Sequence, residues 1–407
     1  MQSYYVILFL CLLVMLSYVF TLISKYTRIP SVVLLLGTGI GLKYLGDSYH
    51  LALAGVNDYV QMLGTVGLIM IVLEASLDLH VTREKTSLIR NSFLSAIVIL
   101  AVSVIAITLV LQFWLHESFI NSLVYAIPLS IISSAIVIPS VTHLEENKKE
   151  FLIYEASFSD IIGIIIFNYF TAGEVFSLQS LFGFVGGIVA GIIISLVVSV
   201  FLIYMLTKIR INIRFFLIFS ILIFLYVSGK MLHLPSLIII MMFGLLINNW
   251  HLLRRQQLVK WSFFDNNEVE QIALLMKSLT AETAFLIRTF FFVIFGYSIN
   301  VGMLFNKEVV IVGTLIVGIL LLARVLLLRF FVHSSVMPEV LMLPRGLITI
   351  VLFYIIPENL RLKSFNEGIL FYVVLLTSLL MMVGLMIHTT DKPKKEEEER
   401  AVFGETA

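Results

Sequence analysis

Long apolar stretches separated by short polar connections run through almost the whole chain. A helix needs about 20 apolar residues to cross a hydrocarbon layer about 30 Å thick. By this measure the pattern predicts about thirteen membrane-spanning helices. They fall approximately at residues 2–24, 29–45, 60–78, 92–114, 121–142, 151–172, 178–206, 214–230, 235–249, 283–300, 309–332, 341–357 and 366–388. An odd number of spans places the two termini on opposite sides of the membrane.

The charges in the connections predict which side is which. Alternate connections carry most of the Lys and Arg residues, for example at 83–90, 208–214 and 254–260, and cytoplasmic loops hold such an excess. We therefore expect a multi-pass protein of the inner (plasma) membrane, with its N-terminus outside and its C-terminus in the cytoplasm. Residues 261–282 mix charged and apolar residues at helical spacing and are expected to lie along the cytoplasmic interface. Residues 391–407 form a charged cytoplasmic tail.

The fifth span is interrupted in a way that ordinary spans are not. It carries Pro128 and Pro139, with Ser133 and Ser134 between them. Pro139 has no N–H to donate to the carbonyl of Ala135. That carbonyl and the serine hydroxyls are therefore expected to be free near mid-membrane, although prolines in spans also occur without function.

The twelfth span is short and is broken by Pro344 and Gly346. Paired, Pro/Gly-interrupted spans at matching places in two halves indicate a transporter site between inverted repeats. The two broken spans are an odd number of helices apart, so the second copy would run inverted. The predicted organisation is one membrane domain at 1–390, with repeat one at 1–173, a linker helix at 178–206 and repeat two at 214–390.

Composition supports the membrane setting. Of the 407 residues, 60% are hydrophobic and 13% are charged, against about 45–50% apolar and 25% charged in soluble domains. The predicted fold class is an all-α polytopic membrane protein with two inverted repeats of about six helices, whose broken helices cross at mid-membrane. The net charge of +1 argues against a nucleic-acid partner, and the single cysteine, Cys11, excludes a disulfide framework.

Two carboxylates, Glu155 and Asp160, lie inside the sixth span. With a rise of about 1.5 Å per residue, Asp160 lies roughly 13 Å from Phe151, where the apolar stretch begins, and so close to mid-membrane. A carboxylate at that depth costs on the order of 3 kcal/mol, and such residues usually face a cavity or an ion path. The alternative is a structural acid that hydrogen-bonds to a neighbouring helix.

Further charges lie in or at the ends of the apolar segments. Arg324 and Arg329 are near the cytoplasmic end of the eleventh span and are expected to snorkel. Asp78 is at the cytoplasmic end of the third span, where a carboxylate needs no special role. Glu74, about one turn deeper, is either a hydrogen-bonded structural acid or an accessory to an ion path. Arg288 in the tenth span either snorkels or lies beside the site.

Arg345 lies at the break of the twelfth span, where it has no route to water if the break is at mid-depth. A guanidinium there needs a carboxylate partner. Glu155 and Asp160 are about 140° apart around their helix, so they cannot both face the same partner. This geometry suggests a structural Glu155–Arg345 pair and a titrating Asp160.

Five motifs in order resemble the monovalent cation:proton antiporter superfamily over nearly the whole chain. They are TRIPSVVLLLGTGIG (27–41), GLIMIVLEASLDL (67–79), EASFSD (155–160), FFFVIFGYSIN (290–300) and LPRGLITIVL (343–352). The resemblance implies that Asp160 carries the cation and the proton, and that Glu155 pairs with Arg345.

Two positions depart from the superfamily pattern. Ser159 replaces the Asn or Asp that precedes the ion-carrying Asp in the superfamily. The break of the fifth span reads SSAIVIPS, which is nearer to potassium-efflux relatives than to the Thr-Asp of many sodium-type members. The choice between Na⁺ and K⁺ therefore stays open.

The expected function is electroneutral antiport of Na⁺ or K⁺ against H⁺ by a homodimer in the lipid bilayer, with no cofactor. Burial favours the neutral form of a carboxyl, so a proton and a cation can displace each other at Asp160. The hydroxyls of Ser133, Ser134 and Ser159 would complete an oxygen shell for the cation.

Two other functions are alternatives to cation antiport. The first is a sodium-coupled organic anion transporter of the same fold, which the mid-membrane acid argues against. The second is an intramembrane enzyme, which the absence of an HExxH or GxGD motif or a nucleophile–histidine arrangement in the spans argues against.

Overall fold

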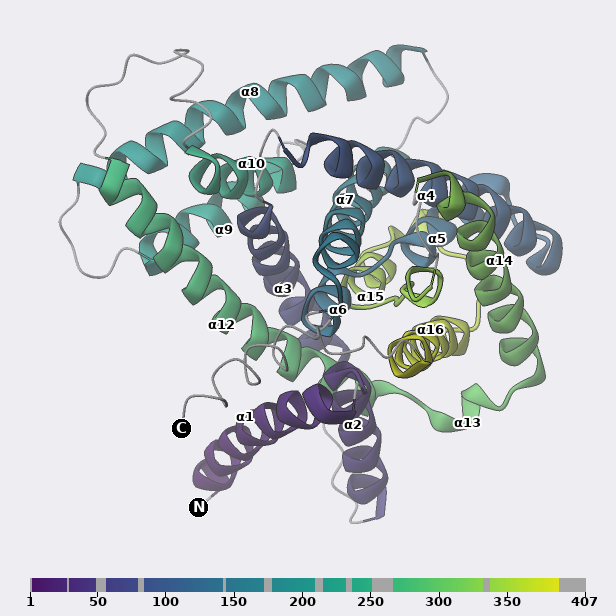
Figure 1. The fold of residues 1–407 in the computed structure, drawn as a ribbon. Helices are drawn as coiled ribbons and strands as arrows, with labels where there is room; N and C mark the ends of the chain where they lie inside the picture. The colour runs from purple at the N-terminus through teal and green to yellow at the C-terminus, as the bar shows by residue number, and fades with distance from the viewer. Residues whose placement is uncertain are drawn as a thin grey trace, which may run out of the picture.

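The computed structural model describes residues 2–27, 29–48, 56–79, 84–141, 144–171, 178–208, 215–231, 236–250, 266–331 and 337–387. Throughout these ranges the chain is helical apart from short connections, and no strand occurs in them (Figure 1). The tail predicted at 391–407 lies outside the described residues.

The helices follow the predicted spans in order, and the predicted all-α membrane fold is confirmed. The helices are α1 (Gln2–Thr27), α2 (Ser31–Ser48), α3 (Val56–Asp78), α4 (Thr86–Leu115), α5 (Phe119–Ser130), α6 (Ser134–Ser140), α7 (Glu146–Thr171), α8 (Leu178–Lys208), α9 (Phe215–Met231), α10 (Ser236–Asn248), α12 (Asn266–Ser298), α13 (Val301–Leu304), α14 (Lys307–Phe331), α15 (Leu347–Tyr354) and α16 (Gly368–Ile387), with 3-10 turns η1 (Glu339–Leu341) and η2 (Glu358–Leu360). Seven helices in the described part of the chain are long and apolar enough to cross a membrane.

The two interrupted spans cross at their breaks. The fifth span divides into α5 and α6, which are joined by residues 131–133 without helical structure, and the twelfth divides into η1 and α15, which are joined by residues 342–346. The backbone N–H of Ser133 donates to the carbonyl of Pro344 over 2.9 Å, so the breaks touch directly. Both α6 and α15 pack against α7, and α15 also packs against α5, the other half of the fifth span (Figure 1).

The break of the fifth span does not lie at its prolines. Pro128 is inside α5 and Pro139 is inside α6, whereas the sequence pointed to Pro139. The extended residues instead lie where their N–H groups find partners on other segments. Ile132 donates to Ser159, and Ser133 donates to Pro344. Tertiary hydrogen bonds therefore set this break, while Pro344 and Gly346 do lie in the second one.

The predicted interfacial helix at 261–282 is wrong for the part that the structure describes. Residues 266–282 continue without interruption into the tenth span as the single helix α12. The charges that suggested an interfacial helix have partners on neighbouring helices: Lys277 pairs with Asp78 over 2.8 Å, and Glu282 accepts from Tyr18 over 3.0 Å. Residues 261–265 lie outside the described ranges.

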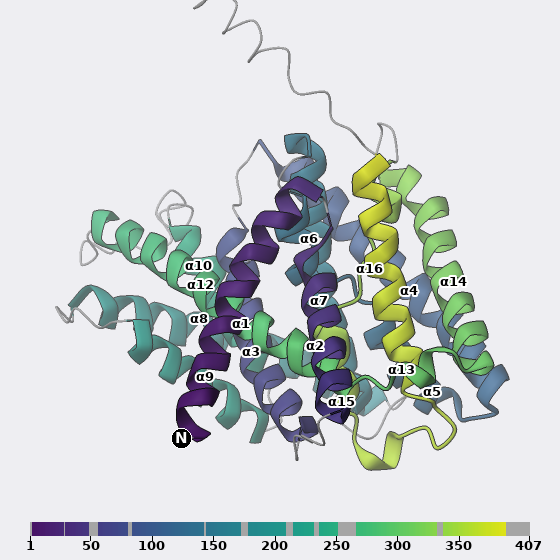
Figure 2. The same cartoon turned by 90° about the horizontal axis from the view of Figure 1, so that it is seen from below.

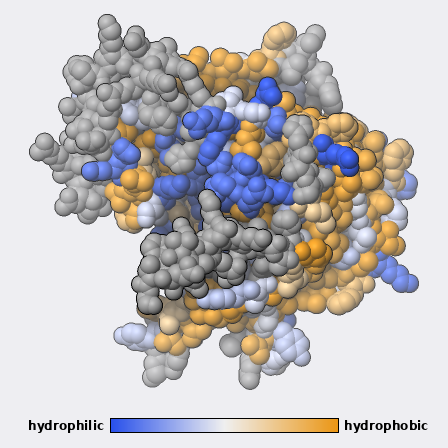
Figure 3. Space-filling view, in the orientation of Figure 1, coloured by the Kyte–Doolittle hydropathy of each residue, from blue (hydrophilic) through white to orange (hydrophobic). Residues whose placement is uncertain are grey.

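The start of α1 and the end of α16 lie on opposite faces of the bundle (Figure 2), as an odd number of spans requires. On the face where α16 ends, hydrophilic side chains gather near the centre, and hydrophobic ones predominate along the right-hand side of the view (Figure 3). Large apolar side chains are exposed along α1, α8 and α14. An apolar rim is the surface expected of a bundle that lipid surrounds.

Two glycines allow the backbones of α2 and α12 to touch. A Cβ added to Gly39 would meet the carbonyl oxygen of Val293, and one added to Gly296 would meet that of Leu36. Small residues at a crossing let helices approach closely and gain packing contacts in a membrane, where apolar burial alone gives no preference for a protein neighbour. This crossing fixes α12 against α2.

We expect Gly39→Ala to destabilise the protein, because the added methyl would collide with a backbone that cannot yield without moving α12. Overpacking of this kind costs about 1–3 kcal/mol, and thermal unfolding in detergent measures it. Gly37→Ala on the same helix is the matched control, since a Cβ there meets nothing within 4 Å. Equal melting temperatures for both variants would contradict this description of the crossing.

Candidate functional site

Asp160 lies at the crossing of the two breaks. It is 2% exposed, and its Oδ2 accepts a hydrogen bond from the backbone N–H of Ser134 at the start of α6 over 3.0 Å. The neighbouring Ser159 hydroxyl accepts from the N–H of Ile132 over 3.0 Å. Two adjacent side chains of α7 thus hold the extended segment between α5 and α6. The second oxygen of Asp160, Oδ1, has no hydrogen-bond partner among the described residues.

Unpaired serine hydroxyls lie at the same break of the fifth span. The hydroxyls of Ser133 and Ser134 are both buried with no hydrogen-bond partner in the described part of the chain, and the backbone N–H of Ser134 is the group that donates to Asp160. Gly346 leaves room for Ser133, because a Cβ on Gly346 would lie 2.5 Å from its Oγ. Leaving buried oxygens unpaired costs about 1–3 kcal/mol each. Such oxygens can bind a proton or a hard cation.

Arg345 does not pair with Glu155, and that prediction is wrong. Its guanidinium instead donates to three backbone carbonyls, those of Leu129 at 2.8 Å, Ser130 at 3.1 Å and Leu343 at 2.7 Å. Leu129 and Ser130 end α5, where carbonyls have no partner inside the helix and carry the negative end of its dipole. The positive charge of Arg345 therefore caps a half-helix that ends inside the bundle.

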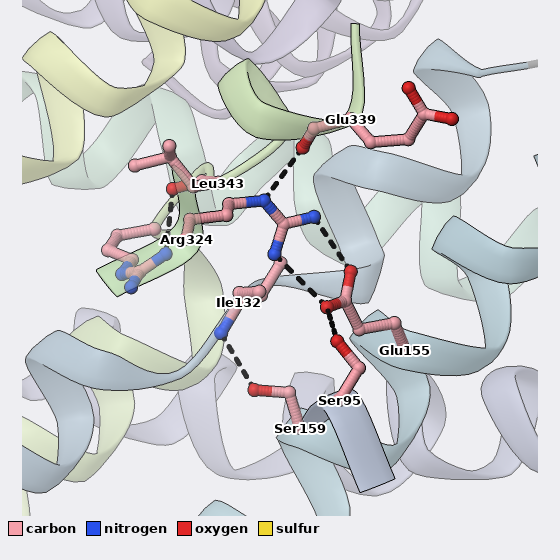
Figure 4. Close-up of polar contacts among 8 residues, drawn as sticks. Ser95, Ile132, Glu155, Ser159, Arg324, Glu339 and Leu343 are labelled. Carbon is pink, nitrogen blue, oxygen red and sulfur yellow. Dashed lines mark hydrogen bonds and ion pairs between the residues drawn. The ribbon is translucent and has the colours of Figure 1, made fainter. Parts of the chain in front are cut away.

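Glu155 pairs with Arg324 of α14. The guanidinium donates to both carboxylate oxygens, at 2.7 Å and 3.2 Å, and both side chains are 1% exposed. Figure 4 shows that Ser95 of α4 also donates to Glu155, over 2.7 Å, and that Arg324 Nε donates to the carbonyl of Glu339 over 2.7 Å. Arg324 was expected to snorkel to the cytoplasmic surface. It is instead buried, because α14 turns this position toward α7.

Two functional neighbours of Glu155 and Arg324, Ser95 and Glu339, carry little signal in the sequence. Ser95 is one of many serines in apolar segments, so its type carried no signal. Glu339 lies in the connection before the twelfth span, where an acid resembles an ordinary loop charge, yet it is 1% exposed. Its place just before a broken span was the one feature that could have drawn attention to it.

Glu74 and Arg288 pair with one another. Arg288 on α12 donates to both carboxylate oxygens of Glu74 on α3, at 2.8 Å and 3.3 Å, and the two side chains are 13–14% exposed. Arg288 therefore does not snorkel. The Asp78–Lys277 pair lies one turn away along α3, so the third span and α12 are joined by two ion pairs.

Comparison with known proteins gives a family and a fold. The family model described as sodium/hydrogen exchanger, transmembrane, matches residues 10–390. The structure of the sodium proton antiporter MjNhaP1 from Methanocaldococcus jannaschii at pH 8 is similar, with a TM-score of 0.67, 16% identity, and 95% of this chain and 96% of that chain covered. An electron-microscopy structure of MjNhaP1 gives a TM-score of 0.68 and 17% identity over 96% and 100%. No curated protein sequence matches.

A double-mutant cycle tests the Glu155–Arg324 pair. Glu155→Gln or Arg324→Gln alone should cost about 3–5 kcal/mol of stability, because each strands a buried charge, and the double variant should lose clearly less than the sum. Unfolding in detergent measures all three.

The matched control combines Glu155→Gln with Arg329→Gln, since Arg329 is an exposed arginine on the same helix. Its effects should add. Additive losses for Glu155 with Arg324, or coupling as large with Arg329, would show that the pair does not exist.

Proposed function

Because the chain belongs to the sodium/hydrogen exchanger family, we propose that it exchanges Na⁺ for H⁺ through a single carboxylate, Asp160. The family and the fold are those of membrane cation/proton antiporters rather than of enzymes. One observation carries the proposal: Asp160 is buried at the contact of two broken helices and has one oxygen without a partner among the described residues.

The oxygen atoms around Asp160 provide the cation site. Asp160 Oδ1 supplies the negative charge, and the hydroxyls of Ser133 and Ser134 supply neutral oxygen ligands beside it. Ser159 already accepts one N–H, and its second lone pair can face the cation. Because a buried carboxylate is costly when it is bare, either a proton or a cation must neutralise Asp160. The two therefore compete for one place, which is the requirement for exchange.

We propose that the exchange is electroneutral, because the other buried acids have basic partners. Glu155 is held by Arg324, Glu74 by Arg288, and Glu339 by Lys148. The hydroxyl of Ser159 does not ionise near neutral pH, and a guanidinium does not deprotonate in proteins. Glu74 was the acid that threatened this stoichiometry, and Arg288 gives it a counter-charge through two hydrogen bonds. One proton then moves for one cation.

The buried carboxylate of Asp160 argues against transport of an organic anion. A sodium-coupled carrier of organic anions would place an anion against Asp160, and like charges repel. Sodium is favoured over potassium by the family and by the likeness to a sodium proton antiporter, with K⁺ the alternative cation.

We further propose a homodimer, with the N-terminus outside, in which the bundle that contains the crossed helices moves against the remaining helices to give alternating access.

Asp160→Asn should abolish exchange without preventing folding, because an amide cannot carry either the proton or the cation's counter-charge. Proton movement in proteoliposomes after addition of Na⁺ or K⁺ measures this. Glu146→Gln is the control, since Glu146 is an exposed acid at the start of the same helix, and it should exchange normally. Cation-dependent proton movement at the normal rate in Asp160→Asn would contradict exchange through Asp160.

Membrane potential should neither drive nor slow exchange, because no net charge crosses when one proton leaves for one cation. The test uses proteoliposomes with the pH gradient held at zero, a valinomycin-set potassium potential and Na⁺ as the transported ion. Sodium flux that follows the voltage would overturn the stoichiometry. Repeating the experiment with Glu74→Gln would then show whether Glu74 carries the second proton.

A further inference from the structure

A second buried ion pair lies beyond Glu155 and Arg324, at the start of α7. Lys148 Nζ lies 3.2 Å and 3.3 Å from the two carboxylate oxygens of Glu339, and it also donates to the carbonyl of Met337 over 2.7 Å. Lys148 is 8% exposed and Glu339 is 1% exposed. Pairs on the surface contribute about 0–1 kcal/mol, but for a lysine and a glutamate this deeply buried, losing either partner strands a buried charge.

Glu339 is fixed from two sides. Its backbone carbonyl accepts from Arg324 of α14, while its carboxylate points away from Arg324 (Figure 4) and meets Lys148 of α7. Lys148 also donates to the backbone carbonyl of Met337, two residues before Glu339. The turn at 337–339 is thus clamped at three points, and it directly precedes the extended residues 342–346.

That extended segment contacts a residue of the proposed cation site. Pro344 accepts the N–H of Ser133, and Gly346 packs against the Ser133 hydroxyl. Ser134, the next residue, donates to Asp160. A displacement of the clamped turn along the segment would therefore move Ser133 and Ser134 relative to the carboxylate.

These contacts close a ring that begins and ends on α7. From Asp160 it runs through Ser134 and Ser133 to Pro344, along the chain to Glu339, and through Lys148 back to α7. Lys148 and Asp160 are about 18 Å apart along that rigid helix. A ring closed at both ends allows much less movement of the crossing than one hydrogen bond at the site would.

We infer that Lys148 and Glu339 are positioning residues for cation binding at Asp160. They touch neither the cation nor the proton, and they act by fixing where the second broken span crosses the first. Small displacements of ligands reduce the occupancy of a preorganised site. This inference rests on the proposed function, because it takes Asp160 to be the place where the cation binds.

The test compares apparent KM for Na⁺ with kcat in proteoliposomes. Lys148→Met should raise KM on the order of tenfold, with a smaller change in kcat, because the carboxylate that exchanges the ions is intact. Lys148→Arg, which keeps the cation, should restore most of the affinity. Glu339→Gln keeps the size of the side chain and an oxygen acceptor, so it should raise KM less than Lys148→Met does. If Lys148→Met does not fold, the KM of Glu339→Gln tests the positioning role.

Lys149→Met is the matched control. It removes the same charge one residue away, from a pair with Glu146 that is open to solvent, and its KM should equal that of the wild type. A pair that only stabilised the fold would lower the melting temperature and leave KM unchanged.

The outcomes separate this inference from the proposed function. Unchanged KM in both Lys148→Met and Glu339→Gln, or an equal rise in Lys149→Met, would overturn the positioning role alone. A wild type that moves no protons with Na⁺ or K⁺ would overturn the proposed function, and the positioning role with it.

Discussion

The structure depends on how the ends of two interrupted helices are satisfied inside the bundle. A helix that stops at mid-membrane exposes carbonyls or N–H groups that water cannot reach, and each would cost several kcal/mol. Arg345 takes the last carbonyls of α5, and Asp160 takes an N–H at the start of α6. The breaks also bond to each other through Ser133 and Pro344. The interactions that make the breaks possible are the same ones that assemble the candidate site.

Charge is distributed around this crossing so that one acid is left for exchange. Glu155, Glu339 and Glu74 each have a basic partner within 3.3 Å, and such pairs are locked because breaking one strands a buried charge. Asp160 has only a backbone N–H and neutral hydroxyls near it in the described part of the chain. Its charge is therefore the one that a mobile ion can neutralise. The locked pairs hold the helices, and the unlocked acid is the one that we propose exchanges ions.

Hydropathy and helix-breaking residues predicted much of this arrangement, because both act locally. The order of the spans, the presence of two interruptions and the place of Asp160 within the sixth span could all be read from stretches of about 20 residues. The angle between Glu155 and Asp160 on one helix also led correctly to different partners for the two acids. Those inferences needed nothing beyond the geometry of a single helix.

The choice of partner could not be predicted in this way. Two arginines, Arg324 and Arg345, were candidates for Glu155, and only the packing of α14 against α4 brings Arg324 within reach of it. From the sequence alone, Arg324 resembled a snorkelling residue. The backbone carbonyls that accept from Arg345 could not be predicted, because every residue type has one. Lys148 and Glu339 were missed for a related reason: charges beside apolar segments look solvent-exposed until the fold buries them.

Counting the protons released when the cation binds tests the central claim most directly. Calorimetric titration of the purified protein with NaCl, in two buffers of different ionisation enthalpy at equal ionic strength and pH, gives the protons released per Na⁺. At acidic pH, where Asp160 is protonated before the cation arrives, a single exchanging carboxylate predicts a value that approaches one and vanishes in Asp160→Asn. A value that approaches two, or sodium binding that releases no proton at any pH, would contradict the account.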